Sequence, residues 1–258
     1  MGVKVLFLYP NTFGMNMLPP AIALFSSLLK ERGHKVDLFD ATYYQTNHGI
    51  NSDGTKAERL NVVPFNLEEK GIKMRDADWR VDIIEKVQSF EPDLIALSTT
   101  EDMWLLGVRL LEEMGGYITR HKIPVIAGGV FPTFAPDLVI KHRLVDMVCV
   151  GEGENSLVDL CERLDKGDSY SDVTNLWVKQ KDGSIIKNSI SNPFDIDQTL
   201  MIDTGLFEEQ RFYRPMAGKW YKMMPVETIR GCPYKCSFCN SPDQMDFYKE
   251  TTSSNFFR

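Results

Sequence analysis

Val3–Tyr9 (VKVLFLY) is an almost unbroken apolar run with β-branched and aromatic residues, the pattern of a parallel strand buried on both faces. A pair of prolines then opens a helical pattern over Ala21–Arg32, and Gly33 follows at the position where helices commonly end. Lys35–Phe39 has the pattern of a second strand. The order strand, helix, strand predicts a βαβ unit.

The same alternation continues further along the chain. Three more strands are expected, over Leu94–Ser98, Ile123–Ala127 and Met147–Val150. Helical patterns separate and follow them, over Trp79–Phe90, Met103–Arg120, Phe134–His142 and Ser156–Leu164. We therefore predict an α/β fold in which the first ~165 residues form one doubly wound, five-stranded parallel sheet.

Residues 42–76 interrupt this alternation with Asn, Gly, Asp and scattered charge. A patternless stretch of this length is unusual inside a compact domain and is often functional. Two interpretations stay open, a lid and a surface excursion.

A boundary is expected at Gly167–Asp172, followed by a β-hairpin of Leu176–Lys179 and Ser184–Lys187. Asn192–Lys222 has the composition of an irregular connector, and Met224–Ile229 has the pattern of a strand. The aromatic pairs Phe212-Tyr213 and Trp220-Tyr221 in the connector fit either a substrate channel or, as we favour, a seam between domains.

The overall composition excludes several classes of protein. Of the 258 residues, 43% are hydrophobic and 25% charged, which is typical of a globular protein. The net charge of −7 argues against a nucleic-acid-binding face. No apolar run reaches the length of a bilayer span, and the N-terminus lacks the pattern of a signal peptide. We expect a protein of the reducing cytoplasm, with no membrane partner.

Arg230–Asn240 (RGCPYKCSFCN) holds three of the five cysteines, spaced C-x-x-x-C-x-x-C. Soft thiolates gathered in a loop select zinc, copper(I) or an iron–sulfur cluster. A structural zinc site normally has a fourth Cys or His ligand, but no His follows His142. Three ligands therefore suggest a four-iron cluster with one iron left open, and a zinc knuckle is the alternative.

The cysteine spacing, Phe238 before the third cysteine and the Arg-Gly lead-in resemble the signature of the radical S-adenosylmethionine (SAM) enzymes. The resemblance implies that Cys232, Cys236 and Cys239 bind a [4Fe-4S] cluster and that Phe238 lies near the SAM adenine. In that family SAM chelates the open iron, and the reduced cluster cleaves it to methionine and a 5′-deoxyadenosyl radical. A reductant such as flavodoxin or ferredoxin is implied as a partner.

Members of that family carry the cysteine loop on the first strand of a (β/α) barrel, which here would be Met224–Ile229. The later barrel strands have no counterpart in the sequence, so the chain is expected to be a fragment that is inactive by itself. The expected domains are 1–166, 167–222 as a linker with the hairpin, and 223–258 as the beginning of the barrel domain.

Ligands of open parallel sheets bind beyond the carboxyl ends of the strands, and the predicted strand exits here are rich in Gly, Ser and Thr. Glycine lets the backbone approach a bulky ligand closely, and hydroxyls donate hydrogen bonds. Gly151-x-Gly153 lacks the third glycine of a dinucleotide-binding turn, which disfavours NAD.

The exits over 97–100, 124–133 and 145–154 resemble the Rossmann-like cobalamin-binding domain that precedes many radical SAM domains. The resemblance implies that cobalamin contacts Ser98, Thr99, Thr100, Gly128, Gly129, Thr133, Gly151, Glu152 and Gly153. It also implies that the detached lower base lies near Gly128-Gly129. Because Pro10–Asn16 contains no His, the lower face of the cobalt is expected to be open or bound by water.

The remaining candidate residues are interpreted more plainly. Cys149 and Cys161 fit buried packing positions. The four histidines lie at expected turns and helix ends and are interpreted as solvated, namely His34, His48, His121 and His142. Glu152 and Glu154 are interpreted as capping and ligand-loop residues, with acid–base catalysis as the alternative.

Together these resemblances imply a cobalamin-dependent radical SAM enzyme acting on a small molecule, with methyl transfer to an unactivated carbon as the expected outcome. Ring formation or rearrangement by the same architecture is the first alternative. A non-catalytic cobalamin or partner-binding module with a vestigial cluster loop is the second.

Overall fold

The computed structural model describes residues 2–13, 17–46, 68–217, 219–252 and 254. The expected insertion at 42–76 lies partly outside the described residues, and its possible role as a lid stays a prediction. Its described ends contain two short 3₁₀-helices, η1 (Ala41–Tyr43) and η2 (Glu68–Lys70).

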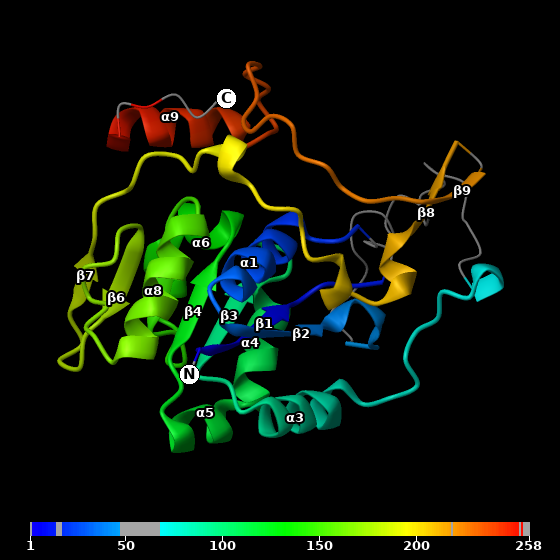
Figure 1. Cartoon of the computed structure of the whole chain (residues 1–258), viewed down its shortest axis with the longest axis horizontal. Coiled ribbons are helices and arrows are strands. Elements are labelled where there is room, and N and C mark those ends of the chain that lie inside the picture. Colours follow the sequence, from blue (N-terminus) through cyan, green and yellow to red (C-terminus); the bar gives the residue numbers. More distant parts are fainter. Residues whose placement is uncertain (1, 14–16, 47–67, 218, 253, 255–258) are drawn as a thin grey trace.

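A seven-stranded sheet organises the molecule, with the strand order β2-β1-β3-β4-β5-β6-β7 (Figure 1). Its strands are β1 (Lys4–Tyr9), β2 (Lys35–Asp40), β3 (Leu94–Ser98), β4 (Val125–Gly128), β5 (Met147–Cys149), β6 (Leu176–Lys179) and β7 (Ile185–Lys187). The first five strands pair in parallel, which confirms the predicted five-stranded parallel sheet.

The predicted hairpin forms, but it continues the main sheet. Strand β6 pairs antiparallel with β5, and β7 pairs antiparallel with β6. Backbone pairing therefore runs past the expected boundary at residue 167, because the edge of β5 offers unpaired backbone groups that the hairpin satisfies.

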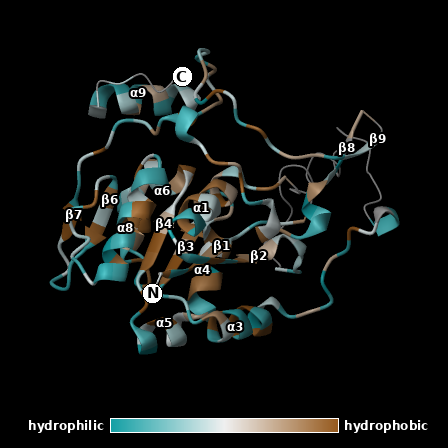
Figure 2. Cartoon of the chain, viewed as in Figure 1, coloured by the Kyte–Doolittle hydropathy of each residue, from teal (hydrophilic) through white to brown (hydrophobic). Residues whose placement is uncertain are grey.

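Helices cover both faces of the sheet. One face packs against α1 (Pro20–Glu31) and α8 (Glu154–Lys166), and the other against α3 (Trp79–Phe90), α4 (Trp104–Glu113) and α5 (Gly115–His121). The strands between these layers are strongly hydrophobic (Figure 2). This arrangement is the doubly wound α/β fold that the apolar runs predicted.

Two predicted helices are divided into shorter ones. The expected helix Met103–Arg120 is α4 and α5, which meet at Met114 before the Gly115-Gly116 pair. The expected helix Phe134–His142 is replaced by α6 (Val130–Phe134) and α7 (Pro136–Val139), because Pro136 has no amide proton to continue the first helix.

The chain after residue 190 differs most from expectation. The connector contains an unpredicted two-stranded sheet of β8 (Tyr213–Met216) and β9 (Lys219–Lys222). The predicted strand Met224–Ile229 is wrong, since this segment pairs with no strand in the described part of the chain. An apolar run alone does not make a strand when no neighbouring edge accepts its hydrogen bonds.

The cysteine loop leads into helix α9 (Ser241–Thr252), which the sequence analysis did not expect. Helix α9 lies beyond one end of the parallel sheet, above α6 in Figure 1. Among the described helices, none is long and apolar enough to cross a membrane.

Candidate functional site

A pocket of about 790 Å³ opens at the carboxyl ends of the parallel strands. It is lined by seven of the nine residues that the sequence assigned to cobalamin, namely Ser98, Gly128, Gly129, Thr133, Gly151, Glu152 and Gly153. The other two do not line it. Thr99 is buried and donates its hydroxyl to the Thr100 carbonyl, while exposed Thr100 donates to Asp102.

A close backbone contact requires glycine at one of these positions, and a second glycine lies tightly against a side chain. Gly129 has a φ of +110°, and a Cβ there would lie 2.5 Å from the Thr99 carbonyl oxygen. A Cβ on Gly153 would lie 3.0 Å from Cζ of Phe25. The strand exits can therefore approach one another, which leaves the space in front of them open to a ligand.

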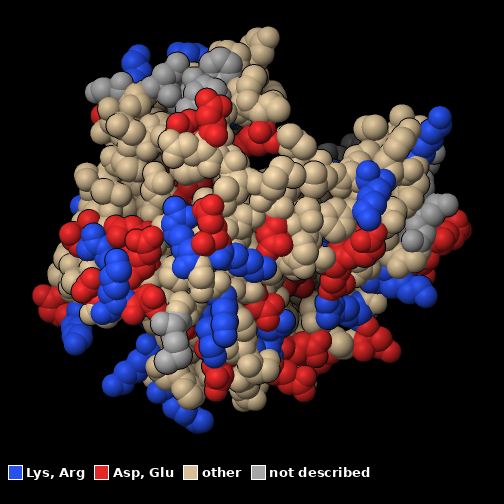
Figure 3. All heavy atoms as spheres, viewed as in Figure 1, with Lys and Arg blue, Asp and Glu red and all other residues tan. Residues whose placement is uncertain are grey.

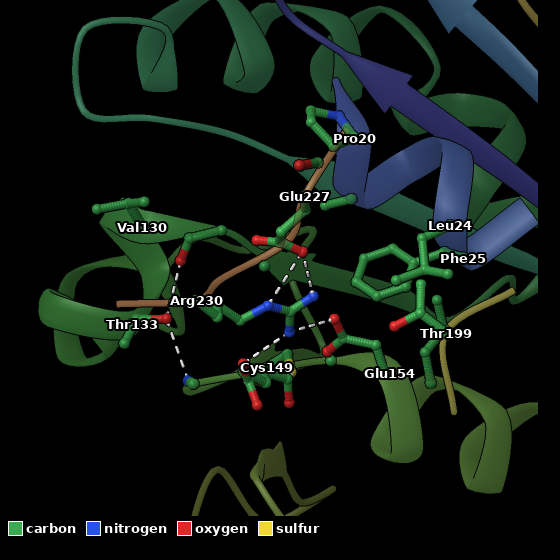
Figure 4. A pocket seen from close by; sticks show the side chains of 18 of the residues that line it. Pro20, Leu24, Phe25, Val130, Thr133, Cys149, Glu154, Thr199, Glu227 and Arg230 are labelled. Carbon is green, nitrogen blue, oxygen red and sulfur yellow. Dashed lines mark hydrogen bonds and ion pairs between the residues drawn. The ribbon is translucent and has the colours of Figure 1, made fainter. Parts of the chain in front are cut away.

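A second wall of the pocket is apolar and comes from α1 and from a segment that the sequence analysis left as a connector. Pro20, Leu24 and Phe25 point into the pocket from α1 (Figure 4). Residues 196 and 199–202 face them. This segment is fixed on α1 by Asp203, whose carboxylate accepts a hydrogen bond from Ser26 (2.6 Å) and pairs with Lys30 (2.5 Å).

The third wall is the C-terminal segment. Its lining residues include Met224–Glu227, Gly231, Ser241 and Tyr248. Gly231 comes directly before Cys232, and Ser241 comes two residues after Cys239, so the cysteine motif begins and ends at this pocket.

The cysteine loop itself projects away from the rest of the molecule. Cys232 is half-buried, Cys236 and Cys239 are exposed, and Phe238 is 92% exposed. The projecting part at the top of Figure 3 is mainly free of charged side chains in that view. Hydrogen bonds from the hydroxyl and backbone N–H of Ser241 lower the pKa of the Cys239 thiol.

The donor set of this loop fits an iron–sulfur cluster, because all three thiols are free and accessible and thiolates are the usual cluster ligands. In the described part of the chain, no three His, Cys, Asp or Glu side chains converge on one mononuclear metal position. The assignments of the three cysteines and of Phe238 stay predictions.

Arg230 ties the start of the cysteine loop to the exit of β5. Its Nη1 atom lies 2.6 Å from Oε1 of Glu152 and 2.7 Å from Oε1 of Glu154, and its Nη2 atom lies 2.8 Å from Oε2 of Glu227 (Figure 4). The side chains of Arg230, Glu152 and Glu154 are 13%, 12% and 5% exposed. In the sequence, Arg230 is apparent only as part of the cysteine motif.

The shifts in pKa at this cluster have identifiable causes. Burial raises the pKa of Glu154, and the charge of Arg230 offsets part of that rise. Burial alone would lower the pKa of Arg230, but the hydrogen bond to Glu227 and the charges of Glu154 and Glu152 hold it above its ordinary value. Arg230 therefore stays charged and compensates the buried carboxylates. The glutamates act as ion-pair partners, beyond the capping and ligand-loop role expected from sequence.

Tyr248 is the second site residue that sequence reasoning missed. It lies on α9, is 2% exposed, and its hydroxyl oxygen accepts a hydrogen bond of 2.6 Å from the Glu152 amide. A Cβ on Gly151 would lie 2.6 Å from that oxygen, so the fit requires glycine there. Two adjacent aromatic residues, Phe247 and Tyr248, stand in this otherwise mostly polar helix, and nothing in the sequence tells which of them becomes fully buried.

The histidine interpretation needs one correction. His34 is 5% exposed and its Nδ1 accepts a hydrogen bond from the Val3 amide, so it is a packed residue rather than a solvated one. His142 is half-buried, His121 is exposed, and His48 lies outside the described residues. Cys149 and Cys161 are buried as predicted, and burial raises the pKa of each thiol to about 12.

The connector aromatics do not line the pocket. Phe212 is buried in the core on the α1 face and Tyr213 stacks on Trp220 within the β8–β9 hairpin, so a seam between domains stays a prediction. The neighbouring Arg211 fixes the connector to the sheet through Asp40 (3.2 Å) and the Met17 carbonyl (2.9 Å).

Comparison with known proteins identifies this architecture. Residues 60–161 match the model of the B12 binding domain. The structure superposes on that of the cobalamin-dependent SAM radical enzyme OxsB, with aqua-cobalamin and SAM bound, at a TM-score of 0.62 and 20% identity over 92% of this chain. Its fold is that of the cobalamin-dependent radical SAM enzymes. The radical SAM methyltransferase TsrM from Kitasatospora setae, with tryptophan and a SAM analogue bound, agrees at a TM-score of 0.55 and 19% identity, over 93% of this chain.

The curated proteins to which this chain is similar include both cyclases and methyltransferases. The chain is 25% identical over 175 residues to the anaerobic magnesium-protoporphyrin IX monomethyl ester cyclase of Rubrivivax gelatinosus, covering 64% of this chain and 29% of that protein. It is 25% identical over 167 residues to an uncharacterized methyltransferase of Pyrococcus horikoshii, covering 64% of this chain and 35% of that protein. The chain thus spans about a third of these relatives, and 28% of the OxsB chain and 41% of the TsrM chain.

Proposed function

We propose that this chain is the cofactor-binding part of a cobalamin-dependent radical SAM enzyme, with cobalamin in the 790 Å³ pocket and a [4Fe-4S] cluster on Cys232, Cys236 and Cys239. One observation carries the proposal: the residues that bracket the cysteine motif line the same pocket as the glycine-rich strand exits. Two cofactors held by these elements would therefore face a common cavity.

The roles of the chain's own residues follow from the pocket. Ser98, Thr133 and the backbone at Gly128-Gly129 offer hydrogen-bonding groups to the polar edge of a corrin. Leu24 and Phe25 offer an apolar wall that excludes water. When bound, the cluster would supply the electron that cleaves SAM, and cobalamin would carry the group to be transferred.

Methyl transfer to an unactivated carbon is the reaction that we favour, and ring formation is the second candidate. Similarity to the Pyrococcus methyltransferase supports the first and similarity to the Rubrivivax cyclase supports the second. The substrate would be a small molecule and the electron donor a reductant such as flavodoxin or ferredoxin, in the cytoplasm.

Cofactor loading of the 258-residue chain tests the proposal. Anaerobic reconstitution with iron and sulfide should give a brown protein with about four iron per chain. A Cys232→Ala/Cys236→Ala/Cys239→Ala variant should lose the iron yet still bind cobalamin. A colourless product that contains zinc would contradict the cluster assignment.

A matched variant at the cobalamin site should have the opposite effect, keeping the iron and losing cobalamin. The backbone of Gly128 does not have a positive φ, and a Cβ there meets only Cβ of Cys149, at 3.6 Å, so Gly128→Leu should fill the pocket without straining the chain. Wild-type protein should retain hydroxocobalamin on gel filtration with a base-off spectrum, whereas Gly128→Leu should retain the iron and lose the corrinoid. Free passage of hydroxocobalamin past the wild-type chain would overturn the assignment and favour a module that binds no cobalamin.

A further inference from the structure

We propose that Arg230 and Tyr248 hold the cysteine loop in place by binding one turn on the pocket rim, Gly151–Glu154, and that this turn couples occupancy of the pocket to the order of the loop. The proposal deepens the function proposed above, on which its coupling part rests. Arg230 and Tyr248 would be positioning residues, since neither carries a cluster ligand.

The two residues stand at opposite ends of the motif. Arg230 precedes Cys232 by two positions, and Tyr248 follows Cys239 by nine. Both bind the same four-residue turn, Arg230 through the carboxylates of Glu152 and Glu154 and Tyr248 through the Glu152 amide. The segment that carries the three cysteines is therefore a loop closed at both ends on the exit of β5.

The turn is fixed independently of the cysteine loop. The Gly151 amide donates to Thr133 Oγ1 (3.1 Å), and the Glu152 carbonyl accepts from Asn175 (2.8 Å). Oε2 of Glu152 also accepts the Phe194 amide at 2.5 Å. The turn is thus a rigid anchor between β5 and α8, and the loop takes its position from it.

The same turn faces the cavity. Gly151, Glu152, Gly153 and Glu154 all line the pocket, as do Arg230 and Tyr248. A ligand pressing on this wall touches the residues that hold the loop, so its binding and the ordering of the loop share contacts. If binding of a ligand orders the loop, then a change that loosens the loop must lower the affinity for that ligand.

The cysteine loop has few other attachments that would make the anchor redundant. Val226 and Ile229 are 75% and 57% exposed, and Phe238 is 92% exposed. Among its described residues, helix α9 contributes one fully buried side chain, that of Tyr248, and the partly buried ring of Phe247. Directed polar contacts at one turn therefore hold the segment more than apolar burial does.

The first test needs no cofactor. Amide hydrogen exchange over residues 223–231, where the Met223 amide donates to the Phe212 carbonyl, should be about tenfold or more faster in Arg230→Gln than in wild type, because the variant loses three of the few contacts that keep this segment closed. Arg163→Gln is the matched control, since Arg163 pairs with Asp159 and Asp172 and does not line the pocket. Unchanged exchange of 223–231 in Arg230→Gln would overturn the anchor.

Two further variants, Arg230→Lys and Tyr248→Phe, keep the test decisive if Arg230→Gln does not fold. Arg230→Lys keeps the charge and should restore part of the protection, and Tyr248→Phe should loosen α9 while leaving 223–231 near the wild-type rate. Glu154→Gln should lessen the effect of Arg230→Gln, because the double variant no longer buries an uncompensated Glu154 carboxylate.

The second test measures coupling with hydroxocobalamin. Its addition should slow exchange over 223–240 in wild type and in Arg163→Gln but not in Arg230→Gln, and the corrinoid should bind Arg230→Gln about tenfold more weakly. Equal slowing in all three proteins would overturn the coupling. If wild type binds no hydroxocobalamin, the proposed function and the coupling fail together, while the cofactor-free rates still decide whether Arg230 anchors the loop.

Discussion

The parallel sheet and the C-terminal segment meet at one pocket but are stabilised in different ways. Every residue of Leu94–Leu97 in β3 is at most 5% exposed, between two layers of helices. The segment from Met223 to Thr252 exposes most of its side chains and is attached by the ion pairs of Arg230, the hydroxyl of Tyr248, the Met223 amide and the partly buried ring of Phe247. The sheet should therefore respond to changes in buried volume, and the segment to the loss of single polar contacts.

The largest expected difference is in thiol reactivity. Cys149 and Cys161 lie in the sheet core, and burial raises the pKa of each to about 12, whereas the loop cysteines are accessible. Because the thiolate is the nucleophile, and its fraction falls tenfold for each pH unit below the pKa, the metal-free chain at pH 8 should alkylate the loop thiols at least ~1000-fold faster.

Mass spectrometry of peptides after a timed iodoacetamide pulse measures this ratio. Labelling of Cys149 and Cys161 should rise only when denaturant unfolds the sheet. Early labelling of either under native conditions would show that the sheet core is more open than its burial implies.

The second prediction compares two apolar truncations. Leu6→Ala removes a fully buried side chain of β1 and should lower the free energy of unfolding by about 2–5 kcal/mol. Ile229→Ala removes a side chain that is 57% exposed, and the change should stay within about 0.5 kcal/mol. Urea denaturation followed by circular dichroism measures both, and equal losses would contradict the distinction between the two regions.

The third prediction concerns two glycines with positive φ. Replacement by alanine should strain the backbone similarly at Gly151 (φ +91°) and Gly183 (φ +86°). A Cβ on Gly151 would also lie 2.6 Å from Tyr248 Oη, whereas a Cβ on Gly183 would meet nothing within 4 Å. Gly183→Ala should lower the free energy of unfolding by about 1–2 kcal/mol, and Gly151→Ala should lower it by about 2–4 kcal/mol.

Thermal and urea unfolding give the two values. Adding Tyr248→Phe to Gly151→Ala should restore part of the lost stability, because it removes the oxygen that the new methyl group meets. If the two alanine variants lose the same stability, α9 does not pack on this turn.

The smallest predicted difference in stability is between two variants that each remove a single hydroxyl. Tyr248→Phe removes the acceptor for the buried Glu152 amide and should cost about 1 kcal/mol. Tyr213→Phe is the matched change, since its hydroxyl donates to exposed Glu209 and should contribute almost nothing. Urea denaturation of both variants measures the two changes in the free energy of unfolding. No change in Tyr248→Phe would indicate that water replaces the lost hydrogen bond.

Prediction from sequence succeeded where local pattern and tertiary environment agree. The apolar runs at β1 and β3 gave the strands, and the predicted strand exits gave seven residues of the pocket wall, four of them glycines. It failed for Met224–Ile229, whose pattern is that of a strand but which has no pairing partner in the described chain. The connector residues 196 and 199–202 and the roles of Arg230 and Tyr248 carried no local signal that distinguished them from surface residues.

The sequence by itself determined the alternation of strands and helices, the parallel sheet and the loop of three thiols, because periodicity and ligand chemistry depend on residues close together in the chain. Only the tertiary structure decided that Arg230 meets Glu152 and Glu154 across 76 positions or more and that Tyr248 closes on Gly151. Such contacts arise when the fold brings distant segments to one end of the sheet, where a buried charge must find its partner.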